Sequence, residues 1–127
     1  MSEGKKIVLA IDDQLIQLDI FQEILISKYD VRVVKSAADA LKFLNSNQAD
    51  IILLDIDMPN ITGFDFLDDI RKIPSYMVVP IVIVSGKTGQ DFFDEARKSS
   101  AYDVLSKPVS PEVLISTIEK ALAEAPD

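Results

Sequence analysis

The sequence predicts a single α/β domain: a doubly wound, five-stranded parallel sheet with helices on both faces. Short apolar runs alternate with segments of helical periodicity, the connections are short, and 127 residues suffice for one core. Several runs are apolar at every position, which is typical of strands covered on both faces. Arg32 and Asp103 interrupt the second and fifth runs, so we expect those strands at the sheet edges. The expected strands are Ile7–Ile11, Val31–Val34, Ile51–Leu54, Ile81–Val84 and Tyr102–Leu105.

A helix is expected after each of these runs. Apolar residues recur there at the i, i+3, i+4, i+7 spacing that buries one helix face. Ser110 before Pro111 is a helix start signal, because serine caps the first turn and proline suits the first helical position. The helix expected at 90–98 has few apolar residues besides Phe92 and Phe93. We therefore expect it to be the least firmly anchored.

Composition and charge exclude several classes of protein. The chain has no cysteine and no histidine, which excludes disulfides, thiolate zinc sites and histidine-activated nucleophiles. Its net charge of −8 argues against nucleic acid as a direct partner. No apolar run approaches the roughly 18 residues of a membrane span, and no signal segment opens the chain, so we expect a cytoplasmic protein without membrane insertion. We expect one domain over residues 1–127, with 121–127 as a tail or linker stub.

Functional groups in an open parallel sheet gather at the carboxyl ends of its strands. Clustered carboxylates repel one another unless a cation lies between them, and ligands that are all oxygen favour a hard cation such as Mg²⁺. A cation beside a lysine stabilises a phosphoryl group in transfer, and a carboxylate can itself be the nucleophile. The residues just beyond the apolar runs are four carboxylates, one hydroxyl and one ammonium: Asp12, Asp13, Asp55, Asp57, Ser85 and Lys107.

In this order the residues resemble the receiver domain of response regulators in two-component signalling, and the resemblance covers essentially the whole chain. It implies strand order 2-1-3-4-5 and a phosphorelay function, in which the domain catalyses only its own phosphorylation and dephosphorylation. The motifs that carry it are Asp12-Asp13, Asp55 with Met58-Pro59 and Gly63, Ser85, and Lys107-Pro108.

The resemblance implies a phosphoacceptor and a metal site. Asp55 would receive the phosphoryl group from a phosphohistidine of a sensor histidine kinase or a phosphotransfer protein. Asp13 and Asp55 would bind Mg²⁺, with Asp12 acting mostly through ordered water. The backbone carbonyl of Asp57 would complete the protein ligands.

Two further side chains would handle the phosphoryl group. By the same resemblance, Ser85 would donate a hydrogen bond to it, and Lys107 would pair first with Asp55 and then with the phosphate. We also expect the peptide bond before Pro108 to be cis, so that the chain turns sharply while Lys107 points back to the site.

Signal output and phosphate lifetime involve three more positions, together with Asp57. Family members usually carry an aromatic residue where this chain has Val104, and valine has too little reach to report by swinging. Since alternate residues of a strand share a face, we expect Tyr102 on the same side as Val104. We propose that output runs through Tyr102 and the helix at 90–98, or through backbone shifts at Ser85-Gly86-Lys87. Partner binding would use the face of the fourth helix, fifth strand and fifth helix, for a downstream protein, an attached effector domain or a phosphorylation-dependent homodimer. We expect Asp57 and Lys87 to pair across the path of the water that attacks the phosphate.

Other interpretations stay open on the sequence. Asp55-Ile56-Asp57 also resembles the Asp-x-Asp motif of haloacid-dehalogenase-type phosphohydrolases, with Asp55 as nucleophile and Asp57 as general acid. That family places its second acidic pair last, whereas Asp12-Asp13 comes first here. A receiver-like fold that only binds partners and takes no phosphate is another alternative. Taken alone, Asp12-Asp13 could also be a turn and helix cap.

Overall fold

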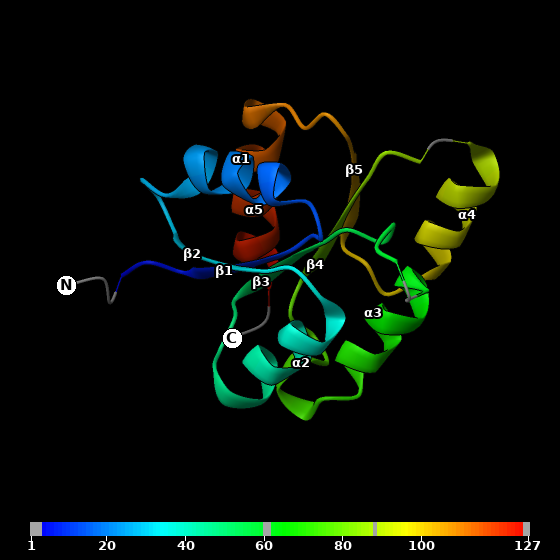
Figure 1. Cartoon of the computed structure of the whole chain (residues 1–127), viewed down its shortest axis with the longest axis horizontal. Helices are drawn as coiled ribbons and strands as arrows, with labels where there is room; N and C mark the ends of the chain where they lie inside the picture. Colours follow the sequence, from blue (N-terminus) through cyan, green and yellow to red (C-terminus); the bar gives the residue numbers. More distant parts are fainter. Residues whose placement is uncertain (1–3, 60–61, 88, 126–127) are drawn as a thin grey trace.

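The computed structural model describes residues 4–59, 62–87 and 89–125. It contains one five-stranded parallel sheet with the expected strand order β2-β1-β3-β4-β5 (Figure 1). The strands are β1 (Ile7–Ile11), β2 (Asp30–Val34), β3 (Ile51–Leu54), β4 (Ile81–Ser85) and β5 (Asp103–Ser106). The helices are α1 (Leu15–Leu25), α2 (Ala37–Ser46), α3 (Gly63–Arg71), the short 3₁₀ helix η1 (Pro74–Tyr76), α4 (Gln90–Lys98) and α5 (Pro111–Glu124).

The helices form layers on the two faces of the sheet. Helices α1 and α5 cover one face, α2 and α3 cover the other, and α4 lies beyond the β4–β5 side (Figure 1). Each face has its own buried apolar cluster. All residues of β3 and β4 are buried, as their uninterrupted apolar runs predict. β2 and β5 are the edge strands, so the prediction from Arg32 and Asp103 is confirmed.

Helix α5 confirms its start signal and includes part of the expected tail. The Ser110 hydroxyl accepts a hydrogen bond from the backbone N–H of Val113, and Pro111 is the first helical residue. The helix continues to Glu124, with Ala121 buried against the sheet. Residues 121–124 of the expected tail form the last turn of α5, while residues 126–127 lie outside the described part of the chain.

The last strand corrects the expected position of Tyr102. β5 begins at Asp103, and Tyr102 packs against the cluster beneath α1 and α5, whereas Val104 packs against the cluster on the other face. The Tyr102 hydroxyl donates to Glu124 Oε1 at 2.9 Å. The expectation that Tyr102 and Val104 share a face is wrong, because Tyr102 precedes the strand and its side chain is directed toward α5.

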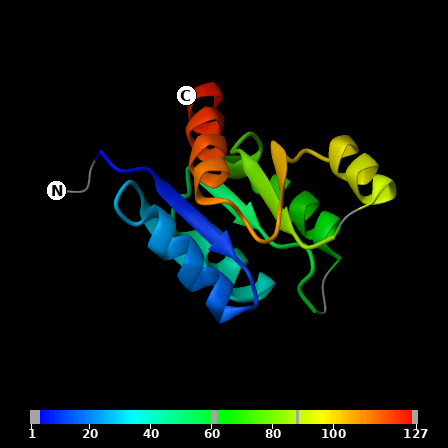
Figure 2. The same ribbon diagram turned by 90° about the horizontal axis from the view of Figure 1, so that it is seen from above.

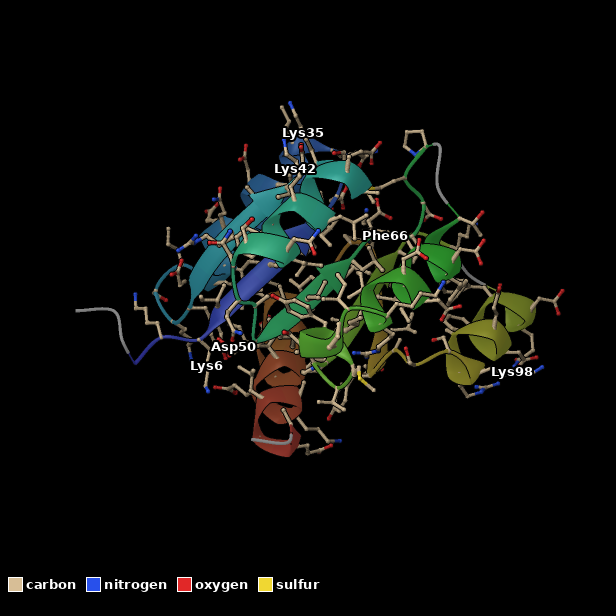
Figure 3. The ribbon with its side chains drawn as sticks, turned by 90° about the horizontal axis from the view of Figure 1, so that it is seen from below. Lys6, Lys35, Lys42, Asp50, Phe66 and Lys98 are labelled. Atoms are coloured by element: carbon tan, nitrogen blue, oxygen red, sulfur yellow. The ribbon has the colours of Figure 1, made fainter. Side chains whose placement is uncertain are left out.

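Helix α4 has little buried surface, as predicted. Of its residues, all of which the structure describes, Ala96 alone is buried, while Phe92 and Phe93 are half-buried. In contrast, Phe66 of α3 lies in the core between that helix and the sheet (Figure 3). Lys98, at the end of α4, extends into solvent on the outer side of the molecule (Figure 3).

An arginine that the sequence did not single out joins the loops around α3 and α4. Arg71 donates to the carbonyl oxygens of Tyr76 and Val79, at 2.9 and 2.5 Å, and to Oγ and O of Ser100, both at 2.9 Å. Burial lowers the pKa of Arg71 from its usual value. These bonds connect the end of α3 to the segment before β4 and to the loop after α4, so they hold the C-terminal end of α4 in place.

None of the helices in the described ranges combines the length and the hydropathy that a membrane span requires.

Candidate functional site

Three carboxylates converge at the carboxyl edge of the sheet, as the sequence predicts. The parallel register aligns Ile11 with Leu54, so the residues that follow them, Asp12 and Asp55, lie just beyond the ends of the neighbouring strands β1 and β3. Asp12 and Asp55 are buried, at 0% and 3% exposed, whereas Asp13 is exposed. Each of these three aspartates offers one carboxylate oxygen, and the three oxygens lie within 4.8 Å of one another. Figure 2 shows the carboxyl ends of the central strands at this common edge.

Lys107 reaches the same cluster from the end of β5. Its Nζ lies 2.9 Å from Asp12 Oδ2 and 3.5 Å from Asp55 Oδ2. The peptide bond between Lys107 and Pro108 is cis, which confirms the prediction. The family resemblance implied pairing with Asp55; the structure adds a shorter contact with Asp12. One ammonium does not neutralise three carboxylates, so the cluster retains a net negative charge.

The electrostatics of Asp55 follow from its surroundings. Burial raises the pKa of Asp55 to about 6, a rise that the hydrogen bond from the Asp57 backbone N–H opposes and the nearby Asp12 charge increases. Lys107 also opposes the rise. For Lys107 itself, burial acts to lower the pKa, but the hydrogen bond to Asp12 and the charge of Asp55 outweigh it, so its pKa is raised and the ammonium stays charged.

The chemistry of the donor set matches a hard cation. Every side chain of the cluster offers oxygen, and the chain contains neither imidazole nor thiolate. Carboxylate and carbonyl oxygens are the ligands that Mg²⁺ prefers, and a divalent cation would relieve the repulsion among these aspartates. Asp12, Asp13 and Asp55 therefore fit a Mg²⁺ site.

A second group of side chains lies beside the cluster, between the loops that follow β3 and β4. Lys87 Nζ lies 3.5 Å from Asp57 Oδ1, so the expected pair between these residues is confirmed. The Ser85 hydroxyl donates to Asp57 Oδ2 at 2.8 Å and accepts from the Lys87 backbone N–H at 3.0 Å. The sequence did not predict the bond between Ser85 and Asp57. The sequence contains a signal for this hydrogen bond, since both residues lie at or just beyond the carboxyl ends of neighbouring strands.

Gly63, part of the predicted motif, has a packing role. A Cβ atom at this position would lie 2.1 Å from the Cβ of Ile56, which follows the phosphoacceptor candidate Asp55. No side chain fits there without moving the β3–α3 loop, so glycine allows the start of α3 to approach this loop closely.

Comparison with known protein families decides which family has this geometry. Residues 8–119 match the family model described as response regulator receiver domain. The chain belongs to the response regulator receiver domain family. The match includes all but the first residue of the sheet, and it includes Asp12, Asp13, Asp55 and Lys107.

Individual relatives support the same assignment. This receiver domain is 31% identical over 121 residues to the DNA-binding transcriptional regulator NtrC of Rhizobium meliloti, covering 95% of this chain but 25% of the relative. It is 32% identical over 106 residues to the two-component response regulator ORR3 of rice (Oryza sativa), covering 82% of this chain and 81% of the relative. The high-resolution structure of the chemotaxis response regulator CheY4 of Vibrio cholerae superposes with a TM-score of 0.84 at 28% identity, covering 92% of this chain and 98% of that chain.

Membership in the family bears on the site. Receiver domains bind Mg²⁺ at an acidic aspartate cluster and interact with histidine kinases and effector domains, and this chain has the cluster. The phosphohydrolase alternative, with Asp55 and Asp57 as its acids, is not favoured. The chain spans about a quarter of the length of NtrC.

Proposed function

We propose that this receiver domain accepts a phosphoryl group on Asp55 from a phosphohistidine of a sensor histidine kinase or a phosphotransfer protein. A carboxylate oxygen of Asp55 attacks the phosphorus, the P–N bond to the donor imidazole breaks, and the released imidazole takes a proton from solvent. The observation that carries the proposal is the position of Asp55: buried at the end of β3, within 4.8 Å of two further carboxylates and 3.5 Å from an ammonium.

The proposal assigns Asp12, Asp13 and Asp55 to Mg²⁺, together with the backbone carbonyl of Asp57. Bound there, Mg²⁺ would supply the positive charge that offsets the negative charge of the phosphoryl oxygens. The all-oxygen donor set and the net negative charge of the cluster support this assignment. Asp12 also accepts the Gln14 backbone N–H at 3.0 Å, which holds its carboxylate in the cluster.

Lys107 and Ser85 are proposed to bind the phosphoryl group. The Lys107 ammonium lies between Asp12 and Asp55, so it needs only a small shift to pair with an oxygen attached to Asp55. Ser85, fully buried at the end of the neighbouring strand β4, would donate a hydrogen bond from its hydroxyl to another phosphoryl oxygen. In this proposal the domain works in the cytoplasm and catalyses only its own phosphorylation and dephosphorylation.

We also propose that the phosphodonor protein docks on the exposed apolar face of α1. Leu15, Ile16 and Ile20 are 61%, 72% and 40% exposed, and Leu15 opens the helix two residues after Asp13. Val113 of the adjacent helix α5 is 49% exposed. Large apolar side chains gathered next to the phosphoacceptor suit a partner that has to bring its phosphohistidine to Asp55.

The phosphoacceptor is tested by mass spectrometry after incubation with acetyl phosphate and Mg²⁺. The unmodified sequence should gain one phosphate, EDTA should prevent it, and Asp55→Asn should gain none. Asp65→Asn, which removes an exposed acid of α3, is the control and should be phosphorylated normally. Equal incorporation in Asp55→Asn would refute the assignment, and no incorporation in the unmodified protein would favour a domain that only binds partners.

A further inference from the structure

The hydroxyl of Ser85 has no donor capacity left for a phosphoryl group. A serine hydroxyl carries one proton, and here that proton goes to Asp57 Oδ2 at 2.8 Å. Ser85 is 0% exposed, so solvent offers it no alternative partner. Its oxygen also accepts the Lys87 backbone N–H at 3.0 Å, which orients the hydroxyl toward Asp57.

We propose that the Asp57 carboxylate is a positioning residue that competes with the phosphoryl group for the Ser85 hydroxyl and so favours the unphosphorylated conformation. The inference rests on the proposed function, since it takes Asp55 as the phosphoacceptor and Ser85 as a phosphoryl ligand. Phosphorylation of Asp55 then exchanges one acceptor of the Ser85 proton, a carboxylate oxygen, for another, a phosphoryl oxygen.

The geometry of Asp57 suits this role. Its backbone N–H donates to Asp55 Oδ1 at 2.9 Å, which holds the residue directly beside the phosphoacceptor. Its two carboxylate oxygens have different partners: Oδ2 accepts from Ser85, and Oδ1 lies 3.5 Å from Lys87 Nζ. The Lys87 side chain is 62% exposed, so this ion pair is weak, whereas the hydrogen bond from the buried Ser85 to a charged acceptor is the stronger contact.

The same contacts connect the site to α4. Through Ser85 and Lys87, Asp57 holds the loop after β3 against the loop after β4, which leads into α4. Around Gly86 there is open space, since a Cβ atom added there would have no neighbour within 4 Å. Once Ser85 changes its acceptor, the weak ion pair between Lys87 and Asp57 is the remaining contact of this attachment, and α4, with little buried surface, is the element that can follow the β4–α4 loop.

The expected effect is measurable as a binding constant. A hydrogen bond to a charged group contributes enough to change an equilibrium about tenfold. Beryllofluoride, which mimics a phosphoryl group on a carboxylate oxygen, should therefore bind about tenfold more tightly in the presence of Mg²⁺ to Asp57→Asn, whose neutral amide is a weaker acceptor for Ser85. Asp57→Ala removes the acceptor altogether and should bind at least as tightly. NMR titration measures both constants.

A double-mutant cycle with Ser85→Ala separates competition for the hydroxyl from the loss of one negative charge near an anion. If Asp57 acts through Ser85, the effect of Asp57→Asn should fall to less than about twofold in the Ser85→Ala background. Asp68→Asn, an exposed acid of α3, is the charge control and should leave the binding constant unchanged. Without Mg²⁺ or beryllofluoride, the amides of Gly86 and Lys87 should become more mobile in Asp57→Asn and stay unchanged in the control.

Two outcomes would overturn the inference and can be told apart. In the first outcome, the unmodified protein binds beryllofluoride, but Asp57→Asn has no effect or has the same effect with and without Ser85→Ala. This result refutes the competition and leaves the phosphoacceptor assignment intact. Absence of binding by the unmodified protein refutes the proposed function and the competition with it.

Discussion

Replacing Asp55 with asparagine should stabilise the domain in EDTA at neutral pH. Burial raises the pKa of Asp55 from 3.8 to about 6, which means that the folded protein disfavours the ionised carboxylate. A shift of this size corresponds to about 3 kcal/mol at roughly 1.4 kcal/mol per pKa unit. Asparagine has nearly the same shape and no charge, and Lys107 keeps its 2.9 Å contact with Asp12. We therefore expect the free energy of unfolding to rise by about 2–3 kcal/mol at pH 7.

The stabilisation by Asp55→Asn should depend on pH. Because the folded-state pKa lies above the unfolded value, the folded chain binds the proton more tightly between about pH 4 and pH 6. The stability contributed by protonated Asp55 is fully present below about pH 4 and is lost as the pH rises through 6. Urea unfolding in EDTA at pH 4, 5, 6 and 7 should show the difference between Asp55→Asn and the unmodified protein growing across this window.

The matched control removes an equivalent charge elsewhere. Asp68→Asn, on the exposed face of α3, should show no such growth with pH. Mg²⁺ should stabilise the unmodified protein more than Asp55→Asn, since the variant lacks one of the proposed ligands. A stability difference that stays constant from pH 4 to pH 7 would refute the argument from burial.

Four further predictions follow from other contacts. Lys87→Ala removes the ion pair with Asp57 and should shorten the lifetime of the phosphorylated form, measured by loss of label after the donor is removed. An equal or longer lifetime would count against a role of this ion pair in slowing the water that attacks the phosphate. Ile16→Ser should reduce phosphoryl transfer from a phosphodonor protein several-fold but leave phosphorylation by acetyl phosphate unchanged. The control is Ile26→Ser, which should affect neither reaction, since Ile26 is 61% exposed and lies at the far end of α1. Gly63→Ala should destabilise the fold by about 1–3 kcal/mol in thermal unfolding because of the 2.1 Å approach to a neighbouring side chain; unchanged stability would show that the loop relaxes freely. Tyr102→Ala removes the hydrogen bond from Tyr102 to Glu124 of α5. It should leave phosphate incorporation intact and weaken phosphorylation-dependent self-association in analytical ultracentrifugation, and normal self-association would remove Tyr102 from the output route.

The order of the elements and the place of the site could be predicted from sequence because both depend on local patterns. Uninterrupted apolar runs such as Ile51–Leu54 mark strands buried on both faces, and the next residue of a parallel strand falls at the functional edge. Arg32 and Asp103 marked the two edge strands because a charge is tolerated where one side of a strand is open. These features can be recognised without knowing which residues contact one another in the tertiary structure.

Only the tertiary structure decided which partners the side chains take. Ser85 donates to Asp57 from 28 positions away, and Lys107 lies closer to Asp12, 95 positions away, than to Asp55. Tyr102 packs in the layer opposite the one that the alternation of a strand predicted, because the strand begins one residue later. Such pairings depend on strand register and side-chain rotamers, which are settled when the layers pack. The sequence by itself determined the fold and the groups that gather at the sheet edge; packing determined how those groups pair.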